Sequence, residues 1–384
     1  MKIALVHKRL DLRGGTERVF YRTAEGLRER GHEIHLFCGE FGIPPPPGTC
    51  GHRVPCIRWP RTARLLTFAF IAPRVIARFG CDVVMSFDRI AKQDLFRSGG
   101  GPHLAFIEKM MRNSGILRKI WYRLSPYHQC VLAIERRQLS SEGCRKVITV
   151  SQQGKQEMLE YYQMPEEKLV VIYNGVDHLR FHPSRRLNEG KRIRKELDIP
   201  KAHAVVLFVG TWFRRKGLDR LLRLWSNDGL AGIDLLVVGD DAKLAHYRNR
   251  WNQKGIFFVG LRSNVEDYYA AADLLVLPSI QEAFGNVVLE ALASGLPIIT
   301  IPGVGVTTEI EGDLRKGILS NPDDPEELKK RILWLLDRDR WDNLSRTARK
   351  FAEKYSWERY FTELEKQIFE VTRNNSALAY QKWT

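Results

Sequence analysis

The sequence lacks several patterns by which common protein classes are recognised. The longest apolar stretches, such as residues 67–73, fall far short of the roughly 20 residues needed to span a bilayer. The apolar run before Lys8 is too short for a signal peptide, so the chain is predicted to be cytoplasmic and non-spanning. No GxGxxG follows the first predicted strand, where only Gly14-Gly15 stands, and this disfavours an NAD-dependent oxidoreductase.

The cysteines also lack any CxxC spacing. Small buried thiols in a reducing compartment are therefore expected, and disulfides or a zinc site are not. The six residues are Cys38, Cys50, Cys56, Cys81, Cys130 and Cys144.

Acidic residues are absent from one long stretch, residues 41–81. The arginines inside it are Arg53, Arg58, Arg61, Arg64, Arg74 and Arg78. The whole chain has 61 Lys and Arg against 45 Asp and Glu, a net charge of +16. Residues 1–170 hold 28 basic and 16 acidic residues, whereas the remainder holds 33 and 29. A surplus concentrated in one half predicts a polyanionic partner for that half: nucleic acid, an anionic bilayer or a phosphorylated substrate.

What is present is an ordinary globular composition, with 44% hydrophobic and 28% charged residues over 384 positions, enough for two domains. Short β-rich runs alternate with amphipathic helical patterns, which is typical of parallel strands joined by helical crossovers. The predicted strands are 2–7, 33–38, 82–87, 146–151, 204–210, 234–239, 256–259, 273–278 and 297–301.

The second half repeats the opening of the first, because a strand, a loop and a helix begin both halves. The loop is Gly14-Gly15 in the first half and the basic segment 210–217 in the second. We expect an α/β protein of two Rossmann-like, doubly wound domains facing each other across a cleft, where ligands sit outside the carboxyl ends of the strands.

The predicted domain boundaries follow from the same pattern. Residues 1–172 form the first domain and residues 173–355 the second. A terminal helix at 357–372 has one apolar stripe and no strand after it. Residues 356–384 are therefore predicted to cross back onto the first domain.

The most informative stretch is residues 278–291, PSIQEAFGNVVLEA. A strand ends at its start, a polar loop follows, and an apolar helix begins near Asn286. The amides of a helix's first turn have no intrahelical partner and attract phosphate. Glu282 and Glu290 flank that turn and are better suited to uncharged sugar hydroxyls than to a diphosphate. The plain alternative is an exposed loop acid and an ordinary helix glutamate.

A cationic loop, Arg214-Arg215-Lys216, follows the strand at 204–210 and belongs to the same predicted sheet edge. It could neutralise a departing diphosphate. The alternative is a solvated basic loop. Together, the helix start, the two glutamates and this loop indicate a nucleotide-sugar site.

These residues resemble a known family. The segments EAFGNVVLEALASGLPII (282–299) and GTWFRRKGLDRLL (210–222) look like the donor-binding domain of retaining glycosyltransferases of family 4, which have the two-domain GT-B fold. The resemblance covers nearly the whole chain, through Gly14-Gly15-Thr16-Glu17-Arg18, Ser86-Phe87-Asp88-Arg89 and the linker VIYNGVD at 171–177. Within the family the chain is most similar to glucosyltransferases that add the first hexose to the heptose region of the lipopolysaccharide core.

The resemblance implies roles for individual residues of the second domain. Arg215 and Lys216 match the pair that binds the donor diphosphate. Glu282 matches the acid beside the transferred sugar, and Glu290 matches the ribose ligand. The loop around the sugar hydroxyls and the phosphate corresponds to Phe284, Gly285 and Asn286.

For the first domain, the resemblance makes Gly14 and Gly15 the loop that closes on the donor. Asp94 falls where many family members carry a histidine near the reaction centre. It could orient the acceptor or help with its proton, or it could be a structural acid that caps a loop. The implied catalytic residues are thus Asp94, Glu282 and Lys216.

The implied mechanism transfers a hexose, glucose from UDP, to a lipopolysaccharide core or related glycolipid acceptor. Arg215, Lys216 and the helix amides would stabilise the leaving diphosphate. No enzymic nucleophile is evident, which favours a front-face path with retention. No cofactor or metal is expected beyond the nucleotide-sugar co-substrate, because His103 and His128 have no second ligand at suitable spacing.

The basic surplus also predicts a membrane partner. Residues 109–137 contain a single acid, Glu135, and interleave basic with apolar side chains. The basic ones are Lys109, Arg112, Arg118, Lys119, Arg123, Arg136 and Arg137; the apolar ones are Leu117, Ile120, Trp121, Leu124 and Tyr127. We expect Arg112, Arg118, Lys119 and Arg123 to face the cytoplasmic side of an anionic inner membrane.

The arginine-rich segment 53–78, with Trp59, Leu65, Leu66 and Phe68, could extend this surface. The alternative is a solvated helix face whose apolar side packs inward. A phosphorylated glycolipid acceptor fits the same charge pattern.

Two other functions fit parts of the sequence. A basic nucleic-acid-binding protein is compatible with the charge, but no helix-turn-helix, zinc-finger or RRM pattern occurs, so no nucleic-acid partner is predicted. A nucleotide-sugar epimerase or a phosphorylase with the same two domains would differ only in its products. The residues themselves are compatible with UDP, GDP or ADP.

Overall fold

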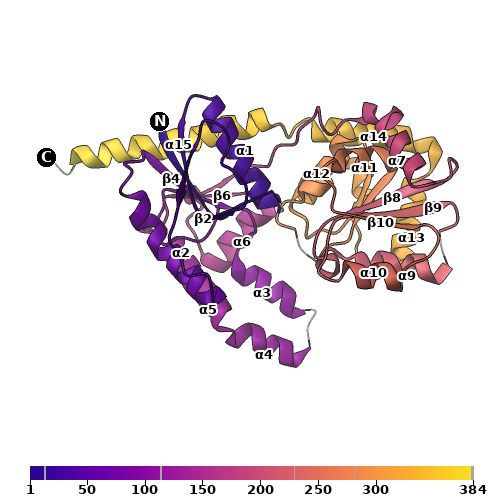
Figure 1. Ribbon diagram of the computed structural model, residues 1–384, viewed down its shortest axis with the longest axis horizontal. Helices are drawn as coiled ribbons and strands as arrows, with labels where there is room; N and C mark the ends of the chain where they lie inside the picture. The colour runs from indigo at the N-terminus through magenta and orange to yellow at the C-terminus, as the bar shows by residue number, and fades with distance from the viewer. Residues whose placement is uncertain (13, 113–114, 229, 281, 382–384) are drawn as a thin grey trace. The chain divides into compact units, whose positions relative to one another are not determined.

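The computed structural model describes residues 1–12, 14–112, 115–228, 230–280 and 282–381. The chain packs as two compact units: unit 1 is Met1–Asn174 with Glu358–Thr384, and unit 2 is Gly175–Trp357. Each unit is a parallel β-sheet covered by helices (Figure 1). The predicted α/β class with two doubly wound domains is confirmed.

Unit 1 contains a sheet in the order β3-β2-β1-β4-β5-β6-β7, and all its pairings are parallel. Its strands are β1 (Lys2–Leu10), β2 (Glu33–Phe41), β3 (Cys50–Arg53), β4 (Val83–Ser86), β5 (Leu95–Ser98), β6 (Lys146–Thr149) and β7 (Leu169–Val171). In β1, the side chains of Ile3, Leu5 and Val6 are fully buried. Helices cover both faces of such a sheet, which accounts for the continuous apolar run of residues 3–6 in β1.

Three of these strands, β3, β5 and β7, were not predicted. They are three or four residues long, and β5 contains an arginine. Arg97 is nevertheless buried: it lies over the ring of Phe87, at 5.2 Å, and donates to Asn174. Its partners are distant in the sequence, so the local pattern could not reveal the strand.

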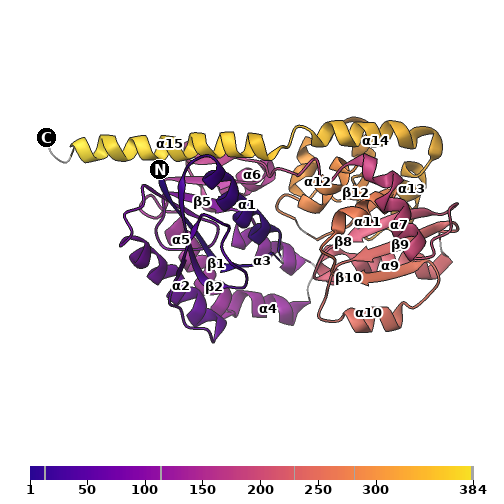
Figure 2. The same cartoon turned by 45° about the horizontal axis from the view of Figure 1, so that its top comes forward.

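The helices of unit 1 include α15, which closes the unit from the end of the chain. They are α1 (Gly15–Glu29), α2 (Arg61–Ile76), α3 (His103–Arg112), α4 (Ile116–Leu124), α5 (Pro126–Gln138), α6 (Gln152–Tyr162), α15 (Trp357–Gln381) and the 3₁₀ turn η1 (Glu166–Lys168). Figure 2 shows α15 in yellow along the side of unit 1.

The docking of α15 depends on its apolar stripe. The stripe predicted from the sequence is buried: Phe361, Leu364, Ile368 and Val371 are at most 2% exposed. Phe361 packs onto Gly26 of α1, where a Cβ atom would come within 1.9 Å of the ring. Only glycine allows this close approach of the helix to the ring.

Unit 2 contains a five-stranded parallel sheet in the order β10-β9-β8-β11-β12. Its strands are β8 (Ala204–Val209), β9 (Ile233–Val238), β10 (Ile256–Gly260), β11 (Leu274–Leu277) and β12 (Ile298–Thr300). Because β8 and β11 are neighbours in this sheet, the loops that leave their carboxyl ends emerge side by side.

The helices of unit 2 alternate with these strands and then end the unit. They are η2 (Pro183–Leu187), α7 (Glu189–Glu196), α8 (Phe213–Lys216), α9 (Leu218–Asp228), α10 (Leu244–Arg250), α11 (Val265–Ala271), α12 (Asn286–Ala293), η3 (Gly305–Glu309), η4 (Gly312–Gly317), α13 (Pro325–Leu335) and α14 (Arg338–Ala352). Within the described ranges, no helix combines the length and apolar character needed to cross a membrane.

The cysteines are all free thiols, but their burial varies. Cys38 and Cys144 are buried, as expected for small packed thiols, and burial raises the pKa of both to about 12. Cys50 is exposed, because β3 lies at the edge of the sheet. The expectation of buried thiols is therefore wrong for Cys50.

Candidate active site

Two loops of unit 2 are fixed together at the carboxyl edge of its sheet. One leads from β8 into α8, and the other leads from β11 into α12. The amide of Ile280 donates to the carbonyl of Arg215 at 2.9 Å. Gly217 has a φ of +84°, and a Cβ atom there would lie 2.1 Å from the carbonyl oxygen of Pro278. Only glycine permits this approach, so the cationic loop is held against the loop of Glu282.

Three side chains converge on one oxygen of the Glu282 carboxylate. The Lys216 ammonium forms an ion pair with Oε1, and Arg215 Nη1 lies 3.6 Å from the same atom. The Ser279 hydroxyl donates to it at 3.3 Å. Arg215 and Lys216 therefore point toward the loop that leads into α12, as the sequence predicted, but Glu282 binds the cations rather than standing apart from them.

Burial dominates the chemistry of Lys216, whose side chain is 10% exposed. Desolvation lowers the pKa of Lys216, and the neighbouring Glu282 and Glu290 carboxylates partly offset that effect. A buried ammonium that is partly neutralised by a carboxylate can exchange that partner for an oxygen of a diphosphate, which carries two negative charges in total.

The loop into α12 opens the start of that helix toward the same edge. Gly285 caps the helix with a φ of +95°, and a Cβ atom there would lie 2.4 Å from Val304. Phe284 is buried, and its carbonyl accepts from Val306 at 2.8 Å. Asn286 is the half-buried first residue of α12. The helix start is thus rigidly placed beside the Glu282 cluster, where its partial positive charge favours an anion.

Glu290 lies on α12, just over one turn beyond its first residue. Its Oε2 accepts from the Tyr269 hydroxyl at 2.8 Å, and Tyr269 is fully buried on α11. This bond sets the orientation of the carboxylate. Sequence reasoning missed Tyr269, because its partner is 21 residues away and nothing in the local pattern marks it.

Arg214 departs from the prediction that grouped it with Arg215 and Lys216. It lies on the other side of the α8 turn and lines a groove with α9 and α10. The start of α8 is held by Asp241, whose Oδ2 accepts from Phe213 N at 2.9 Å. The single turn therefore presents cations in two directions.

In unit 1, Gly14 and Gly15 lie between the carboxyl end of β1 and the start of α1. Gly14 is the N-cap of α1, and its carbonyl accepts from Arg18 N at 3.2 Å. Arg13 lies outside the described residues. The glycine pair thus occupies the carboxyl edge of its own sheet, and its role in closing on a donor remains a prediction.

The position of Asp94 in the sheet of unit 1 does not support a catalytic role. It immediately precedes β5, and its Oδ2 accepts from Val84 N at 2.8 Å, near the amino end of β4. Arg145 Nε lies 3.4 Å from its other oxygen. This is the edge of the sheet opposite the Gly14 loop. The geometry therefore corrects the catalytic assignment in favour of the structural alternative. Asp94 joins β4, β5 and the loop that contains Arg145.

A charged cluster at the carboxyl edge of unit 1 was not anticipated. Lys8 Nζ lies 3.3 Å from the buried Asp88, which follows β4. Burial alone would raise the pKa of Asp88, but Lys8 and His7 hold it well below its usual range. The phrase Ser86-Phe87-Asp88-Arg89 could have identified it, since a charged pair after a buried strand lies where ligands bind.

The same edge continues through Arg89 and Glu135. Arg89 Nη2 lies 2.9 Å from Glu135 Oε1, and the amide of His103 donates to Glu135 Oε2 at 2.9 Å. His103 Nε2 lies 3.0 Å from His128 Nδ1. Burial lowers the pKa of His103 to about 3, so this imidazole is neutral at physiological pH.

Over the described ranges, no group of three or more His, Cys, Asp or Glu side chains is placed to hold a metal ion. Asp337 and Asp339 have an Asp-x-Asp spacing, but Asp337 caps α14 by accepting from Asp339 N at 3.1 Å. Metal independence stays a prediction.

Helix α4 and the end of α3 carry the predicted membrane-facing residues. The basic stretch 109–137 forms three helices, α3, α4 and α5, and Arg112, Arg118, Lys119 and Arg123 are all exposed. Most apolar side chains of α4 are exposed as well: Leu117 is 85% and Trp121 56% exposed, whereas Tyr122 is buried between α3 and α5. The alternative in which the apolar side packs inward therefore holds for Tyr122 but not for the other apolar side chains of α4. In the arginine-rich segment before it, Trp59 is exposed but Phe68 is buried in the core.

Two parallel α/β units, each with its loops gathered at the carboxyl edge of a sheet, are the architecture of the GT-B class of glycosyltransferases. Comparison with protein families gives the more particular assignment. Residues 13–180 match the family model "Glycosyltransferase Family 4", and residues 189–355 match "Glycosyl transferases group 1". The chain belongs to these glycosyltransferases, and the resemblance noted in the sequence is confirmed.

Relatives of known sequence cover most of the chain. An uncharacterized glycosyltransferase of Methanocaldococcus jannaschii, MJ1607, is 28% identical over 353 residues, which is 87% of this chain and 89% of that one. Lipopolysaccharide glucosyltransferase WaaG of Escherichia coli is 25% identical over 324 residues, which is 83% of this chain and 84% of that one.

Solved structures share the fold. The crystal structure of WaaG, a glycosyltransferase involved in lipopolysaccharide biosynthesis, matches with a TM-score of 0.79 at 22% identity, covering 91% of this chain and 95% of that one. The structure of Anabaena Alr3699/HepE in complex with UDP-glucose matches with a TM-score of 0.70 at 18% identity, covering 98% and 100%. At these identities the likeness establishes the architecture.

Proposed function

We propose that this glycosyltransferase is a retaining hexosyltransferase that moves glucose from UDP-glucose to a lipopolysaccharide core or related glycolipid acceptor. Two relatives support this choice. WaaG is named a lipopolysaccharide glucosyltransferase, and HepE was crystallised with UDP-glucose. The acceptor would bind unit 1, which carries most of the basic surplus.

The observation that carries the proposal is the convergence of Arg215, Lys216 and the start of α12 around Glu282. The diphosphate of the donor replaces Glu282 as the partner of the two cations, and the amides of the first turn of α12 bind its oxygens. Glu282, released from Lys216, accepts hydrogen bonds from hydroxyls of the transferred sugar. Glu290, oriented by Tyr269, accepts from the ribose.

The reaction breaks the bond between the anomeric carbon and the phosphate oxygen and forms a bond to the acceptor oxygen. Negative charge develops on the departing diphosphate, and the charges of Arg215, Lys216 and α12 stabilise it there. The acceptor hydroxyl attacks from the face that the diphosphate leaves. Its proton passes to the departing phosphate oxygen. Because attack and departure take place on the same face of the sugar, the configuration is retained without an enzymic nucleophile. Asp94 takes no part in this step, because it lies at the opposite edge of its sheet.

The proposed reaction uses no metal ion. In this account the ammonium of Lys216 and the guanidinium of Arg215 supply the charge that a divalent cation supplies to the leaving group in other enzymes. We expect transfer to continue in the presence of a chelator.

We also propose that α4 anchors the enzyme peripherally to the cytoplasmic face of an anionic inner membrane. The exposed apolar side chains of α4, Leu117 and Trp121 among them, would enter the headgroup region. Arg118, Lys119 and Arg123 on the same helix would lie at the level of the anionic headgroups, and Arg112 at the end of α3 would join them. This surface would bring the donor site to an acceptor that is itself embedded in the bilayer.

The proposal is tested with the full-length protein and a panel of nucleotide sugars. Each is added with a core-glycolipid acceptor, and the products are analysed by mass spectrometry and by NMR of the anomeric centre. We expect a glucosylated acceptor with the donor's anomeric configuration. Inversion would contradict the front-face step, and transfer of another sugar would contradict the assignment of glucose.

Product analysis also separates the related activities. A changed nucleotide sugar without transfer would indicate an epimerase, and sugar 1-phosphate released in the presence of phosphate would indicate a phosphorylase. Either result would replace the proposed function with the corresponding activity.

A further inference from the structure

A groove lies between α9 and α10 on unit 2, with a volume of about 290 Å³. Basic side chains come to it from three helices: Arg214 from α8, Arg223 from α9, and His246 and Arg250 from α10, together with Lys243 just before α10. None of these residues is part of the diphosphate site proposed above.

The cations of this groove outnumber its acids. Over the part of the chain that the structure describes, Arg214, Arg223, Lys243 and Arg250 form no ion pair. The lining acid, Asp219, supplies one negative charge, and its Oδ1 accepts from the Tyr247 hydroxyl at 2.9 Å. Elsewhere on unit 2, comparable arginines are paired: Arg220 of α9, for example, lies 2.7 Å from Asp323. Four positive charges against the one carboxylate of Asp219 leave the groove with a net positive charge, which favours an anion.

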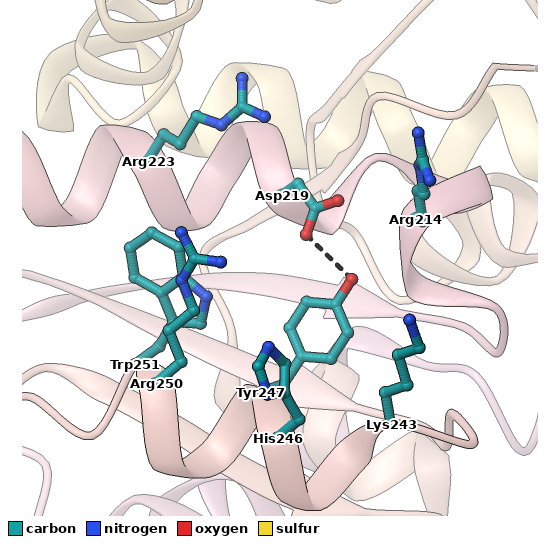
Figure 3. A pocket seen from close by; sticks show the side chains of 8 residues that line it. All are labelled: Arg214, Asp219, Arg223, Lys243, His246, Tyr247, Arg250 and Trp251. Atoms are coloured by element: carbon teal, nitrogen blue, oxygen red, sulfur yellow. Dashed lines mark hydrogen bonds between the residues drawn. The ribbon is translucent and has the colours of Figure 1, made fainter. Parts of the chain in front are cut away.

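The charges lie at two ends of the groove. Figure 3 shows Arg214 and Lys243 at one end and Arg223 with Arg250 at the other. Between them lies the hydrogen bond from Tyr247 to Asp219. Burial and the Asp219 hydrogen bond raise the pKa of Tyr247, so it stays a neutral hydroxyl between the two charged ends.

This arrangement selects a class of ligand. Guanidinium groups bind phosphate oxygens in a bidentate manner, and two separated cationic ends match two phosphates. The second oxygen of Asp219 can accept from a hydroxyl, which a bare polyphosphate lacks. Trp251, over which the Arg250 guanidinium lies at 5.2 Å, forms an apolar wall at the same end.

We propose that the groove between α9 and α10 binds a small soluble molecule with two phosphate groups on a short hydroxylated backbone, such as a sugar bisphosphate. Arg223 and Arg250 hold one phosphate, and Arg214 and Lys243 hold the other. Asp219 accepts from a hydroxyl of the backbone between them.

Occupancy of the groove would reach the donor site through α8. Arg214 belongs to the same four-residue helix as Arg215 and Lys216. A ligand that holds Arg214 therefore restrains the turn that presents the other two cations, and the effect is reciprocal between the two sites. This consequence rests on the proposed donor site, whereas the binding itself does not.

The test uses fructose 1,6-bisphosphate as the probe, titrated calorimetrically into the full-length protein at low salt. We expect saturable one-site binding that weakens as salt is raised. The double variant Arg223→Ala/Arg250→Ala should bind at least tenfold more weakly. A matched control, Arg346→Ala/Lys350→Ala, removes the same charge from exposed positions of α14 and should bind as the wild type does.

Several outcomes would overturn the proposal. These are no binding at millimolar probe, equal binding by the groove variant and the wild type, or loss of binding in Lys216→Ala but not in the groove variant. The last outcome would mean that the probe occupies the diphosphate site. Circular dichroism of each variant establishes that it is folded, and failure of UDP-glucose to bind would affect the proposed function alone.

A phospholipid headgroup offers phosphate chemistry as well. Flotation with phosphatidylglycerol vesicles distinguishes a phospholipid headgroup from a soluble bisphosphate as the ligand of the groove. Equal flotation of the groove variant and the wild type, together with tenfold weaker binding of the bisphosphate, supports a soluble ligand. Flotation lost in the groove variant, with no bisphosphate binding by the wild type, would assign the groove to lipid and overturn the proposal.

Discussion

Lys216 of unit 2 and Lys119 of unit 1 show two ways in which a basic run is built into this fold. Lys216 is buried and paired with Glu282, on a turn anchored by the fully buried Phe213. Lys119 is exposed on α4, beside apolar residues that are exposed too. In the sequence both runs are two or three cations beside an aromatic residue.

The difference is in the apolar neighbours. Phe213 packs against Phe208 and Tyr247, with ring centroids 5.9 and 5.3 Å apart, and this fixes the α8 turn against the sheet. Trp121 leaves much of its surface in solvent. A cation whose aromatic neighbour is buried can serve a site of defined geometry, whereas cations beside exposed apolar groups form a surface suited to a bilayer interface.

Removing the buried cation of Lys216 tests its role in catalysis most directly. We expect Lys216→Ala to lower kcat by about 10²–10³, or about 3–4 kcal/mol of transition-state stabilisation, because the leaving diphosphate loses a preorganised charge. Steady-state transfer kinetics measure the loss. Lys330→Ala, at an exposed position of α13, removes one charge and should leave kcat unchanged. Equal kinetics for Lys216→Ala and the wild type would contradict the role of the buried ammonium.

The exposed cations should matter for location rather than chemistry. Replacing Arg118, Lys119 and Arg123 by alanine should reduce partitioning onto anionic vesicles by about 100-fold, since each basic residue near the surface contributes about 1 kcal/mol. Sedimentation with phosphatidylglycerol vesicles at several salt concentrations measures it, with kcat on a soluble acceptor fragment as a second readout.

A triple variant with the same charge change provides the control. Lys330, Arg346 and Lys350 are exposed on α13 and α14. If their replacement lowers partitioning as much as the α4 replacement does, net charge rather than the α4 surface governs binding.

The pH dependence of kcat tests the role of the buried Lys216 ammonium independently. Burial lowers the pKa of Lys216, so its ammonium loses its proton at a lower pH than an exposed lysine does. We expect kcat to fall about tenfold per pH unit above that lowered pKa, because only the charged form stabilises the diphosphate. Lys216→Arg keeps the charge at all accessible pH values and should move the alkaline limb upward. A pH–rate profile with the same alkaline limb in both proteins would show that another group titrates.

The smallest expected effect concerns Asp94. Asn at this position can still accept from Val84 N, so Asp94→Asn should change kcat less than about twofold and lower the free energy of unfolding by about 1 kcal/mol. Burial raises the pKa of Asp94 while Val84 and Arg145 oppose that effect, as expected of a structural carboxyl. A hundredfold drop in kcat with an unchanged Tm would restore the catalytic assignment.

Much of unit 2 could be predicted from the sequence because its signals are local. The strands β8 and β11 are continuous apolar runs, β9 is apolar apart from Asp234, and Gly285 before an apolar helix marks the start of α12. These features brought Arg215, Lys216 and Glu282 to one sheet edge in the prediction, and the structure places them in contact.

The features that could not be predicted from the sequence depend on contacts between residues that are far apart in the chain. The bond from Tyr269 to Glu290 joins two helices, and the burial of Arg97 depends on Phe87 and Asn174. Asp94 was misassigned because a phrase in the sequence does not show at which end of a strand a residue lies. For α4, the periodicity gives an apolar face but not whether another element covers it.

The central claim is that the α8 turn and the start of α12 hold a diphosphate, and the affinities for UDP and uridine test it most directly. Calorimetric titration of both ligands into the wild type and into Arg215→Ala/Lys216→Ala isolates the contribution of the phosphates. We expect UDP to bind the wild type at least 100-fold more tightly than uridine and the double variant to lose most of that advantage. An advantage of the same size in the variant, or none in the wild type, would contradict the account.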